Sequence, residues 1–388
     1  YGGGLHLVNG YVELDNVIIN GNQGWFEGSA VYTHSSVSQT LAINNSQIIN
    51  NNAQHYTLRI HGGLYMKNTL VSGNHATGEV GGIYKLTSHG VTLDNVTITN
   101  NSGFPTLKII EGPIAITNSI IYGNESDIQM EFQASYNDPL NISYSNIEND
   151  TLALAEHEFL DDFLNWGDGN IDVDPKFVLA DSSNYNLLAS SLCINAANPD
   201  STDSDGTRLD MGALPYLNDY DGGIDLNWWV SADDGSDITG TGENTNPFAS
   251  VQAGLNFAHD NGTVIVSNGL YQENVIWPDY TKKMGVNLIG NDMDNTIIDG
   301  GGIGTVMHVE WVDTTSYMSG FTLQNGFSDD TAIAGGLRID ISEMPIDDII
   351  LQSINGPAFI ITQNSSWGSM ENNDSGWISY YDNWIVRN

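Results

Sequence analysis

One position of a short repeated motif carries aromatic and cationic side chains, in a chain that has few cations. The motif reads GGGLHL at residues 2–7 and GGIYKL at residues 81–86. Tyrosine faces stack on sugar rings, and cations bind carboxylates or sulfates, so this column predicts a glycan-binding strip. Ordinary stacking of neighbouring side chains on the solvent face of a sheet gives the same pattern, and the sequence leaves both interpretations open. The column consists of His6, Tyr32, Arg59, Tyr84 and Lys108.

An acidic stretch, DSTDSDGTRLD at residues 200–210, is the candidate ion site. Calcium prefers clustered oxygen ligands, and it is the only cofactor that the sequence suggests. The spacing is not that of an EF-hand loop, because Ser201 takes the first ligand place and Gly212 the twelfth. A solvated acidic loop is the alternative interpretation. The candidate ligands are Asp200, Asp203, Asp205 and Asp210.

The sequence offers no complete set of catalytic residues. Hydrolysis of a glycosidic bond needs two carboxyl groups about 5 to 9.5 Å apart. Asp15 and Asp94 share one column but would lie three repeats apart, about 14 Å at the spacing of neighbouring strands. Lys67 beside Asp94 could begin a lyase site, although a cross-strand ion pair explains the same two residues. We therefore assign no catalytic residue.

A repeat must position these side chains, and two columns of Asn reveal it. The first column recurs at intervals of 29, 23, 27 and 23 residues. Apolar residues lie two and four positions before it, as on one face of a strand. Five residues after it stand only Gly or Asn, which predicts a positive φ there. The two columns are Asn16, Asn45, Asn68, Asn95 and Asn118, and six residues further on Asn22, Asn51, Asn74, Asn101 and Asn124.

Strands this short cannot bury a face alone, so successive copies must stack. The Asn side chains should then lie about 4.8 Å apart and bond amide to amide. A period of this length gives about three short strands per turn, which predicts a parallel β-helix. In GGIYKL, Ile83 should point inward and Tyr84 outward.

These motifs resemble a known group of proteins. GGGLHL, GGLYM and GGIYKL, coupled to VIINGN, LVSGN or VTITNN, look like repeats of secreted bacterial right-handed parallel β-helix proteins with the pectate-lyase-like fold. They are also similar to the Gly-Gly-apolar and Phe-x-x-Asn repeats of polymorphic outer-membrane proteins, with Ile or Val in place of Phe. The segments from Gly169 and from Asn227 resemble the closing and opening segments of such domains. The resemblance implies that Asp205, Arg208 and Asp210 form a structural closing motif with an arginine–carboxylate pair.

We expect an all-β chain of two tandem right-handed parallel β-helices. Rungs should fill residues 1–150, a closing segment 151–217, a linker 218–227 and a second β-helix 228–388, which ends truncated or irregular because the repeat frame weakens after Leu337. The stretch NPFASVQAGLNFAHDNG predicts a short capping helix that ends at Gly262. YNLLASSLCINAA, from Tyr185, should be the last wall strand of the first β-helix.

Composition excludes some functions. The 388 residues carry 48 acidic and 10 basic side chains, a formal net charge of -38, which repels phosphate backbones and argues against nucleic-acid binding. The single cysteine, Cys193, permits no internal disulfide. No run of about 18 apolar residues predicts a membrane-spanning helix. The chain begins at Tyr1 inside a repeat, so we expect a processed or partial chain.

Three functions remain open. The first is a non-enzymatic secreted or cell-surface module that acts as an adhesin, a glycan binder or a spacer, with a polysaccharide or a neighbouring cell surface as its partner. The second is a carbohydrate-active enzyme, a polysaccharide lyase or glycoside hydrolase that acts on acidic polysaccharide. The third is a purely structural repeat within a larger surface protein. The sequence shows ladders and no cluster of acids and a base, which favours the first.

Overall fold

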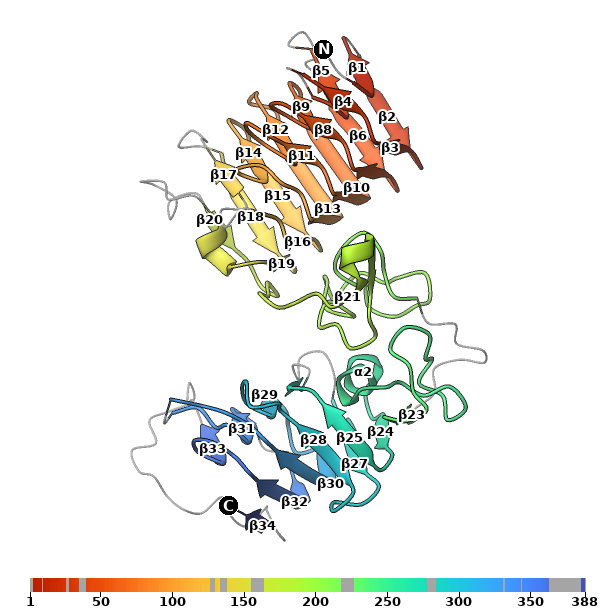
Figure 1. Cartoon of the computed structure of the whole chain (residues 1–388), viewed down its shortest axis with the longest axis vertical. Helices are drawn as coiled ribbons and strands as arrows, with labels where there is room; N and C mark the ends of the chain where they lie inside the picture. The colour runs from red at the N-terminus through yellow and green to blue at the C-terminus, as the bar shows by residue number, and fades with distance from the viewer. Residues whose placement is uncertain are drawn as a thin grey trace. The chain divides into compact units, whose positions relative to one another are not determined.

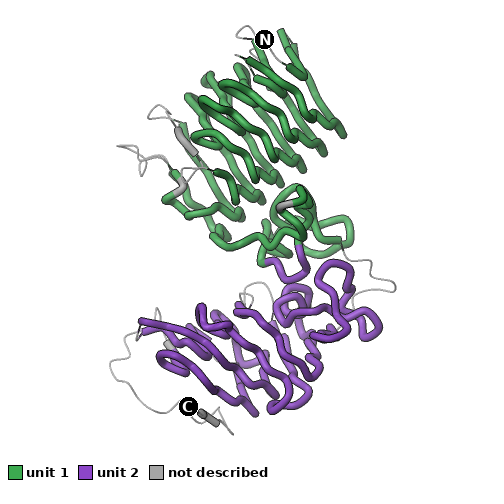
Figure 2. Tube along the Cα trace, viewed as in Figure 1, with its two compact units in different colours: residues 1–187, 192–217 green, residues 188–191, 218–388 purple. Residues whose placement is uncertain are grey.

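The computed structural model describes residues 3–8, 10–25, 28–34, 40–125, 130–132, 138–154, 164–217, 227–277, 284–330, 332–342, 344–362 and 385–387. The chain winds as a parallel β-solenoid of about 12 turns, which confirms the predicted fold class (Figure 1). It divides into two compact units, residues 1–187 with 192–217, and residues 188–191 with 218–388 (Figure 2). None of the described helices is long and apolar enough to cross a membrane.

Three parallel sheets form the walls of the first unit. The first sheet contains β1 (Leu5–Leu7), β5 (Val31–Thr33), β9 (Leu58–Ile60), β12 (Ile83–Lys85), β14 (Leu107–Ile109) and β17 (Met130–Phe132). The second contains β2 (Val12–Asp15), β6 (Leu41–Asn44), β10 (Leu64–Ser72), β13 (Val91–Thr99), β15 (Ile114–Thr117), β18 (Leu140–Ser143) and β20 (Leu164–Trp166), with β3 (Ile18–Asn20), β7 (Gln47–Ile49), β16 (Ile120–Tyr122) and β19 (Asn146–Ile147) around the corner. The third contains β4 (Gln23–Gly24), β8 (Asn52–Ala53) and β11 (His75–Ala76).

The interior of the first unit is a column of aliphatic side chains. Ile83 is fully buried and Tyr84 is only partly buried, as the alternation predicted. Ile60, Met66 and Leu93 are likewise fully buried. Burial of one such side chain contributes about 1.5–3 kcal/mol, so stacked turns supply the stability that one rung lacks.

Two corners of each turn require a left-handed backbone. Gly21, Asn50, Gly73, Asn100 and Gly123 all have positive φ, which confirms the predicted column. The first Asn column also has positive φ, a feature that we did not anticipate. Where Asn is lost from that column, Tyr144 keeps the conformation at a φ of 51°. The corner geometry therefore persists without its preferred residue. The residues of this second corner are Asn16, Asn45, Asn68, Asn95 and Asn118.

The second Asn column forms a continuous side-chain ladder. Each Nδ2 donates to Oδ1 of the Asn in the following turn, at 2.9 or 3.0 Å, from Asn22 through Asn51, Asn74 and Asn101 to Asn124. The first Asn column keeps one such bond, from Asn68 Nδ2 to Asn45 Oδ1 at 3.0 Å, and otherwise bonds different partners. Asn118 donates to Asp94, while Asn95 donates to a carbonyl oxygen of a distant segment.

The end of the first unit departs from the predicted wall strand. This region contains short 3-10 turns at Asp150–Ala153 and Ala180–Ser182. The second turn connects β21 (Phe177–Leu179) to β22 (Asn184–Leu187), and these two strands pair antiparallel. The prediction of a wall strand across YNLLASSLCINAA is therefore wrong. We call residues 192–217, which return to pack on earlier rungs, the returning segment. The stretch LALAEHEFLDDFL at residues 152–164, for which the sequence suggests one short helix, lies mostly outside the described residues.

The second unit is another parallel solenoid with a helical start. Helix α2 (Val251–Phe257) ends five residues before Gly262, earlier than predicted. The Glu273 carboxylate accepts hydrogen bonds from the backbone nitrogens of Val251 and Gln252 at the start of this helix. The strands are β23 (Asn227–Val230), β24 (Thr263–Val266), β25 (Gly269–Gln272), β26 (Val275–Ile276), β27 (Asn287–Gly290), β28 (Thr296–Asp299), β29 (Met307–Glu310) and β30 (Tyr317–Gln324).

Rungs continue past the point where the sequence pattern fades. Strands β31 (Leu337–Asp340), β32 (Ile346–Gln352), β33 (Phe359–Thr362) and β34 (Ile385–Arg387) all pair in parallel with earlier strands. Ile341 occupies a corner there at a φ of 49°, as Trp311 does in the preceding turn at a φ of 58°. The Asn or Gly signal is absent from these corners, which explains why the frame is hard to follow in the sequence.

Candidate functional site

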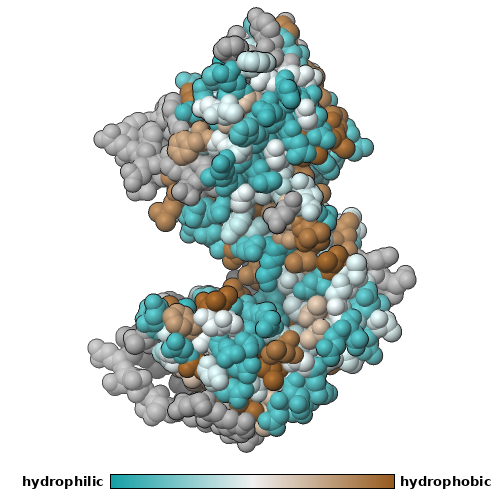
Figure 3. Space-filling model, in the orientation of Figure 1, coloured by the Kyte–Doolittle hydropathy of each residue, from teal (hydrophilic) through white to brown (hydrophobic). Residues whose placement is uncertain are grey.

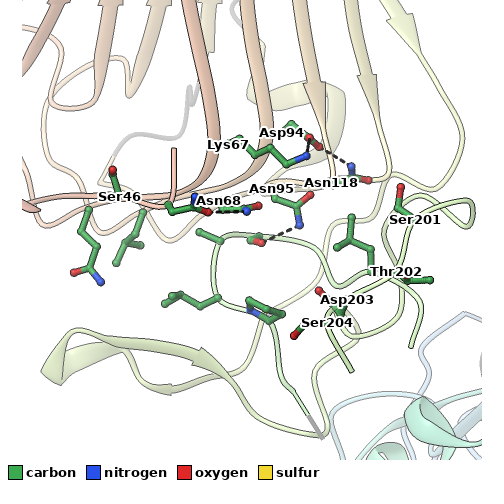
Figure 4. Close-up of a pocket in the computed structure, with 18 residues that line it drawn as sticks. Ser46, Lys67, Asn68, Asp94, Asn95, Asn118, Ser201, Thr202, Asp203 and Ser204 are labelled. Atoms are coloured by element: carbon green, nitrogen blue, oxygen red, sulfur yellow. Dashed lines mark hydrogen bonds and ion pairs between the residues drawn. The ribbon is translucent and has the colours of Figure 1, made fainter. Parts of the chain in front are cut away.

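An open groove lies in the first unit, between the corner of the second sheet and the returning segment (Figure 4). Its volume is about 680 Å³. Hydrophilic side chains cover much of the face of this unit that Figure 3 shows. The rungs contribute Asn45, Ser46, Gln47, Lys67, Asn68, Leu70, Asp94, Asn95 and Asn118, and the returning segment contributes Ser201, Thr202, Asp203, Ser204, Leu209, Gly212, Ala213, Leu214 and Pro215.

Hydrogen bonds fasten the returning segment to the rungs and so fix the groove. The Asn95 side chain donates to the Gly212 carbonyl oxygen at 3.3 Å, and the Gly212 nitrogen donates to the Asn118 carbonyl oxygen at 2.7 Å. The Ala213 nitrogen donates to the Thr97 hydroxyl at 2.9 Å. Because Asn95 and Thr97 are buried, these bonds are shielded from water. Corner side chains thus serve as anchors for a segment that lies about a hundred residues later.

A charged pair forms one side of the groove. Lys67 Nζ lies 3.0 Å from Asp94 Oδ2, and the two residues are in register on β10 and β13. The other carboxylate oxygen, Oδ1, accepts from Asn118 Nδ2 at 2.8 Å and from the Thr117 hydroxyl at 3.3 Å. The hydrogen bond to Asp94 raises the pKa of Lys67. The predicted cross-strand ion pair is confirmed, and its carboxylate is held on both oxygens.

A second carboxyl group comes from the returning segment. Asp203 Oδ2 accepts from the Asp210 nitrogen at 2.8 Å. Burial raises the pKa of Asp203 to about 6, and burial likewise raises the pKa of Asp210 well above its usual range. The Asp210 carboxylate accepts from the nitrogens of Asn195 and Tyr216, both at 2.7 Å, and so holds the two ends of the returning segment together.

The remaining lining is amide, hydroxyl and aliphatic. Asn68 Nδ2 donates to Asn45 Oδ1 at 3.0 Å, and Asn45 Nδ2 donates to Asp15 Oδ1 at 2.8 Å, which orients both amides. Leu70 and Pro215 supply apolar surface. Polar groups held in fixed directions beside a small apolar surface suit a ligand with hydroxyl groups and exposed C–H faces, such as a sugar.

The predicted strip is aligned, but its rings already pack on protein. His6, Tyr32, Arg59, Tyr84 and Lys108 pair in register across the first sheet. The rings of His6 and Tyr32 lie 4.9 Å apart, and the ring of Tyr84 stacks on that of a neighbouring residue, Tyr56, at 4.4 Å. The Arg59 guanidinium lies 5.9 Å from the ring centre of Tyr32, which is only 6% exposed. These contacts match ordinary stacking on a sheet, and glycan binding by this strip stays a prediction.

Most of the candidate calcium ligands accept hydrogen bonds from backbone nitrogens. Asp205 Oδ1 accepts from the Thr207 nitrogen and hydroxyl, and Asp200 is exposed. Arg208 Nε donates to the Ala197 carbonyl oxygen at 2.7 Å. Among the described residues, no group of three or more His, Cys, Asp or Glu side chains could hold a metal ion. The calcium site and the arginine–carboxylate pair stay predictions.

The sequence analysis did not predict that Lys85 is buried. Lys85 is fully buried on the inward face of β12, and its Nζ donates to the carbonyl oxygens of Thr87, His89 and Glu111. Burial lowers its pKa to about 8. The alternation in GGIYKL could have revealed it, since Lys85 stands two residues after the inward Ile83.

Comparison of the chain with protein-family models, with curated proteins and with solved structures gives no match. The resemblance to secreted β-helix proteins therefore rests on the repeat motifs, and what the structure shows is a parallel β-solenoid repeat protein.

Proposed function

We propose that this chain is a non-enzymatic secreted or cell-surface β-helix module that binds a glycan in the groove. The observation that carries the proposal is the lining of that groove. Fixed amides, the Lys67–Asp94 pair and hydroxyl groups converge there beside Leu70 and Pro215.

Preorganisation supports binding at this site. The Asn68 and Asn118 amides and the Asp94 carboxylate are already oriented by hydrogen bonds within the protein. A ligand therefore meets groups whose ordering was completed on folding, which lowers the entropic cost of association. Concave sites with a few convergent polar groups are the usual form of small-ligand sites.

The rest of the molecule suits a role outside the cell as an adhesin or spacer. A stacked solenoid provides reach, and the formal net charge of -38 keeps such a surface soluble. The repeat motifs resemble those of secreted bacterial β-helix proteins, including polymorphic outer-membrane proteins. This resemblance is the basis for the extracellular part of the proposal.

A pair of serine substitutions tests the groove directly. Ser204 is exposed and lines the groove, so Ser204→Trp should fill it without disturbing the core. Ser182 is exposed outside the lining, so Ser182→Trp is the matched control. We expect the purified chain to bind members of an immobilised glycan panel. Ser204→Trp should weaken that binding by about tenfold or more, and Ser182→Trp should preserve it.

The same panel separates the groove from the strip. Binding that survives Ser204→Trp but is lost on Tyr84→Ala and Lys108→Ala would move the site to the strip. Absence of binding to every glycan would remove the binding function and leave a structural spacer.

One observation favours a second candidate, a glycoside hydrolase. Asp94 and Asp203 line the same groove, Asp94 is ion-paired, and the pKa of Asp203 is raised to about 6. Glycosidases use one carboxylate and one carboxylic acid kept protonated by its environment. Release of reducing ends by the wild-type chain, lost in Asp203→Asn, would establish this candidate over the non-enzymatic one.

A further inference from the structure

We infer that the groove selects uncharged, hydroxyl-rich glycans and rejects acidic polysaccharides. This inference rests on the proposed function, since it names the ligand class of the same site. It departs from the acidic polysaccharide that the enzyme hypothesis assumed.

The lining of the groove carries one cation and two carboxyl groups. Lys67 is the one cation among the residues that line the groove, and its ammonium lies 3.0 Å from Asp94. Asp203 adds a second carboxyl group on the opposite side, from the returning segment (Figure 4). A uronate or sulfate that approached the Lys67 ammonium would lie beside the Asp94 carboxylate, and it would meet Asp203 as well. Like charges this close destabilise binding.

Further carboxylates lie next to the groove. Asp15 accepts from Asn45, which lines the groove, and Glu13 accepts from Asn44 on the same strand pair. These carboxylates extend the negative surface beyond the groove. The chain as a whole has 48 acidic and 10 basic residues, which slows the approach of any polyanion at low salt.

The groove also distinguishes neutral from cationic sugars. An amino sugar needs an anion that can pair with its ammonium group. Asp94 already has a partner on each oxygen, Lys67 on one and Asn118 on the other. One oxygen of Asp203 is likewise engaged, since Oδ2 accepts from the Asp210 nitrogen at 2.8 Å. Sugar hydroxyls, which donate and accept, match these groups and the oriented Asn68 amide better than an ammonium does.

The experiment measures affinity for three soluble oligosaccharides of equal length: a neutral hexose oligomer, a uronate oligomer and a glucosamine oligomer. We expect the neutral oligomer to bind about tenfold or more tightly than either charged one. Its affinity should change less than about twofold between roughly 50 and 500 mM NaCl. Asp203→Asn should reduce the difference in affinity between the neutral and the uronate oligomer. Asp168→Asn replaces an exposed residue outside the lining and should leave this difference unchanged.

The outcomes are distinct. If no oligomer binds, the proposed function fails and the selectivity falls with it. Equal or tighter binding of the uronate oligomer overturns the inference but keeps the glycan-binding function. Tighter binding of the glucosamine oligomer, weakened by salt, also overturns it and identifies a cationic ligand.

Discussion

Nδ2 of Asn74 lies 2.9 Å from Oδ1 of Asn101, in the next turn of the solenoid. Oδ1 of Asn74 in turn accepts from both the backbone nitrogen and the side chain of Asn51, at 3.1 and 2.9 Å. The side chain is fully buried. One amide thus joins three successive turns with its donors and acceptor all used.

Asn74→Ala should therefore destabilise the first unit. It removes the oxygen to which the Asn51 backbone nitrogen donates and the amide that donates to the Ile48 carbonyl oxygen, and each buried group left unsatisfied costs about 1–3 kcal/mol. We expect the free energy of unfolding of the first unit to fall by about 2–4 kcal/mol in urea denaturation. Asn52→Ala, an exposed neighbour, is the control and should change it by less than about 0.5 kcal/mol. Equal effects of the two substitutions would show that the ladder adds no stability.

The corner column predicts a backbone effect that packing does not explain. Gly123 has a φ of 65°, and a Cβ there would meet only the Thr99 hydroxyl, at 3.5 Å. Gly123→Ala should cost about 1 kcal/mol through the left-handed conformation alone. Gly123→Asn should cost clearly less, because Asn50 and Asn100 occupy the same corner in other turns. Thermal denaturation of both variants checks this difference in stability. An equal decrease in melting temperature for Gly123→Ala and Gly123→Asn would contradict it.

Lys85 predicts a stability that rises with pH. Its folded pKa is about 8 and its ordinary value 10.5, so the unfolded chain holds the proton over a range where the folded chain releases it. The free energy of unfolding should increase between about pH 8 and 10.5, by about 3 kcal/mol from this group. Lys85→Met should remove that rise. Lys108→Met, on the next strand of the same sheet, should keep the wild-type dependence of the free energy of unfolding on pH, measured by denaturation from about pH 7 to 10.5. Loss of this dependence in Lys108→Met would show that Lys85 is not its source.

Asp203 predicts the opposite slope at lower pH. Its pKa is raised from 3.8 to about 6, so the folded chain binds more protons between those values. Stability of the first unit should fall as pH rises from about 4 to 6, by on the order of 2–3 kcal/mol from Asp203, and the raised pKa of Asp210 acts in the same direction. Asp203→Asn should flatten the curve, measured by denaturation at each pH. Asp168→Asn is the control, and a curve that Asp203→Asn leaves unchanged would sink this assignment.

The sequence predicts those features of the fold that depend on neighbouring residues or on the repeat. The parallel register, the left-handed column at Gly21 and Asn50, and the Lys67–Asp94 pair all follow from spacing along the chain. The groove does not, because Asp203 comes to line it together with Lys67 only through the return of residues 192–217. No periodicity encodes that return.

Other misses have physical causes of their own. Lys85 carries a charge at a position where the alternation predicts an apolar side chain, and backbone carbonyl oxygens accept its hydrogen bonds. Trp311 and Ile341 hold left-handed corners that Asn or Gly would mark in the sequence. Tertiary packing overrides residue preference at each of these places.

The most direct test of the central claim is a crystal structure of the chain soaked with a neutral hexose oligosaccharide. We expect an intact sugar in the groove, with hydroxyl groups bonded to Asn68, Asp94 or Ser204 and a C–H face against Leu70 or Pro215. A sugar bound instead over Tyr32 and Tyr84, or an empty groove at saturating oligosaccharide, would contradict it.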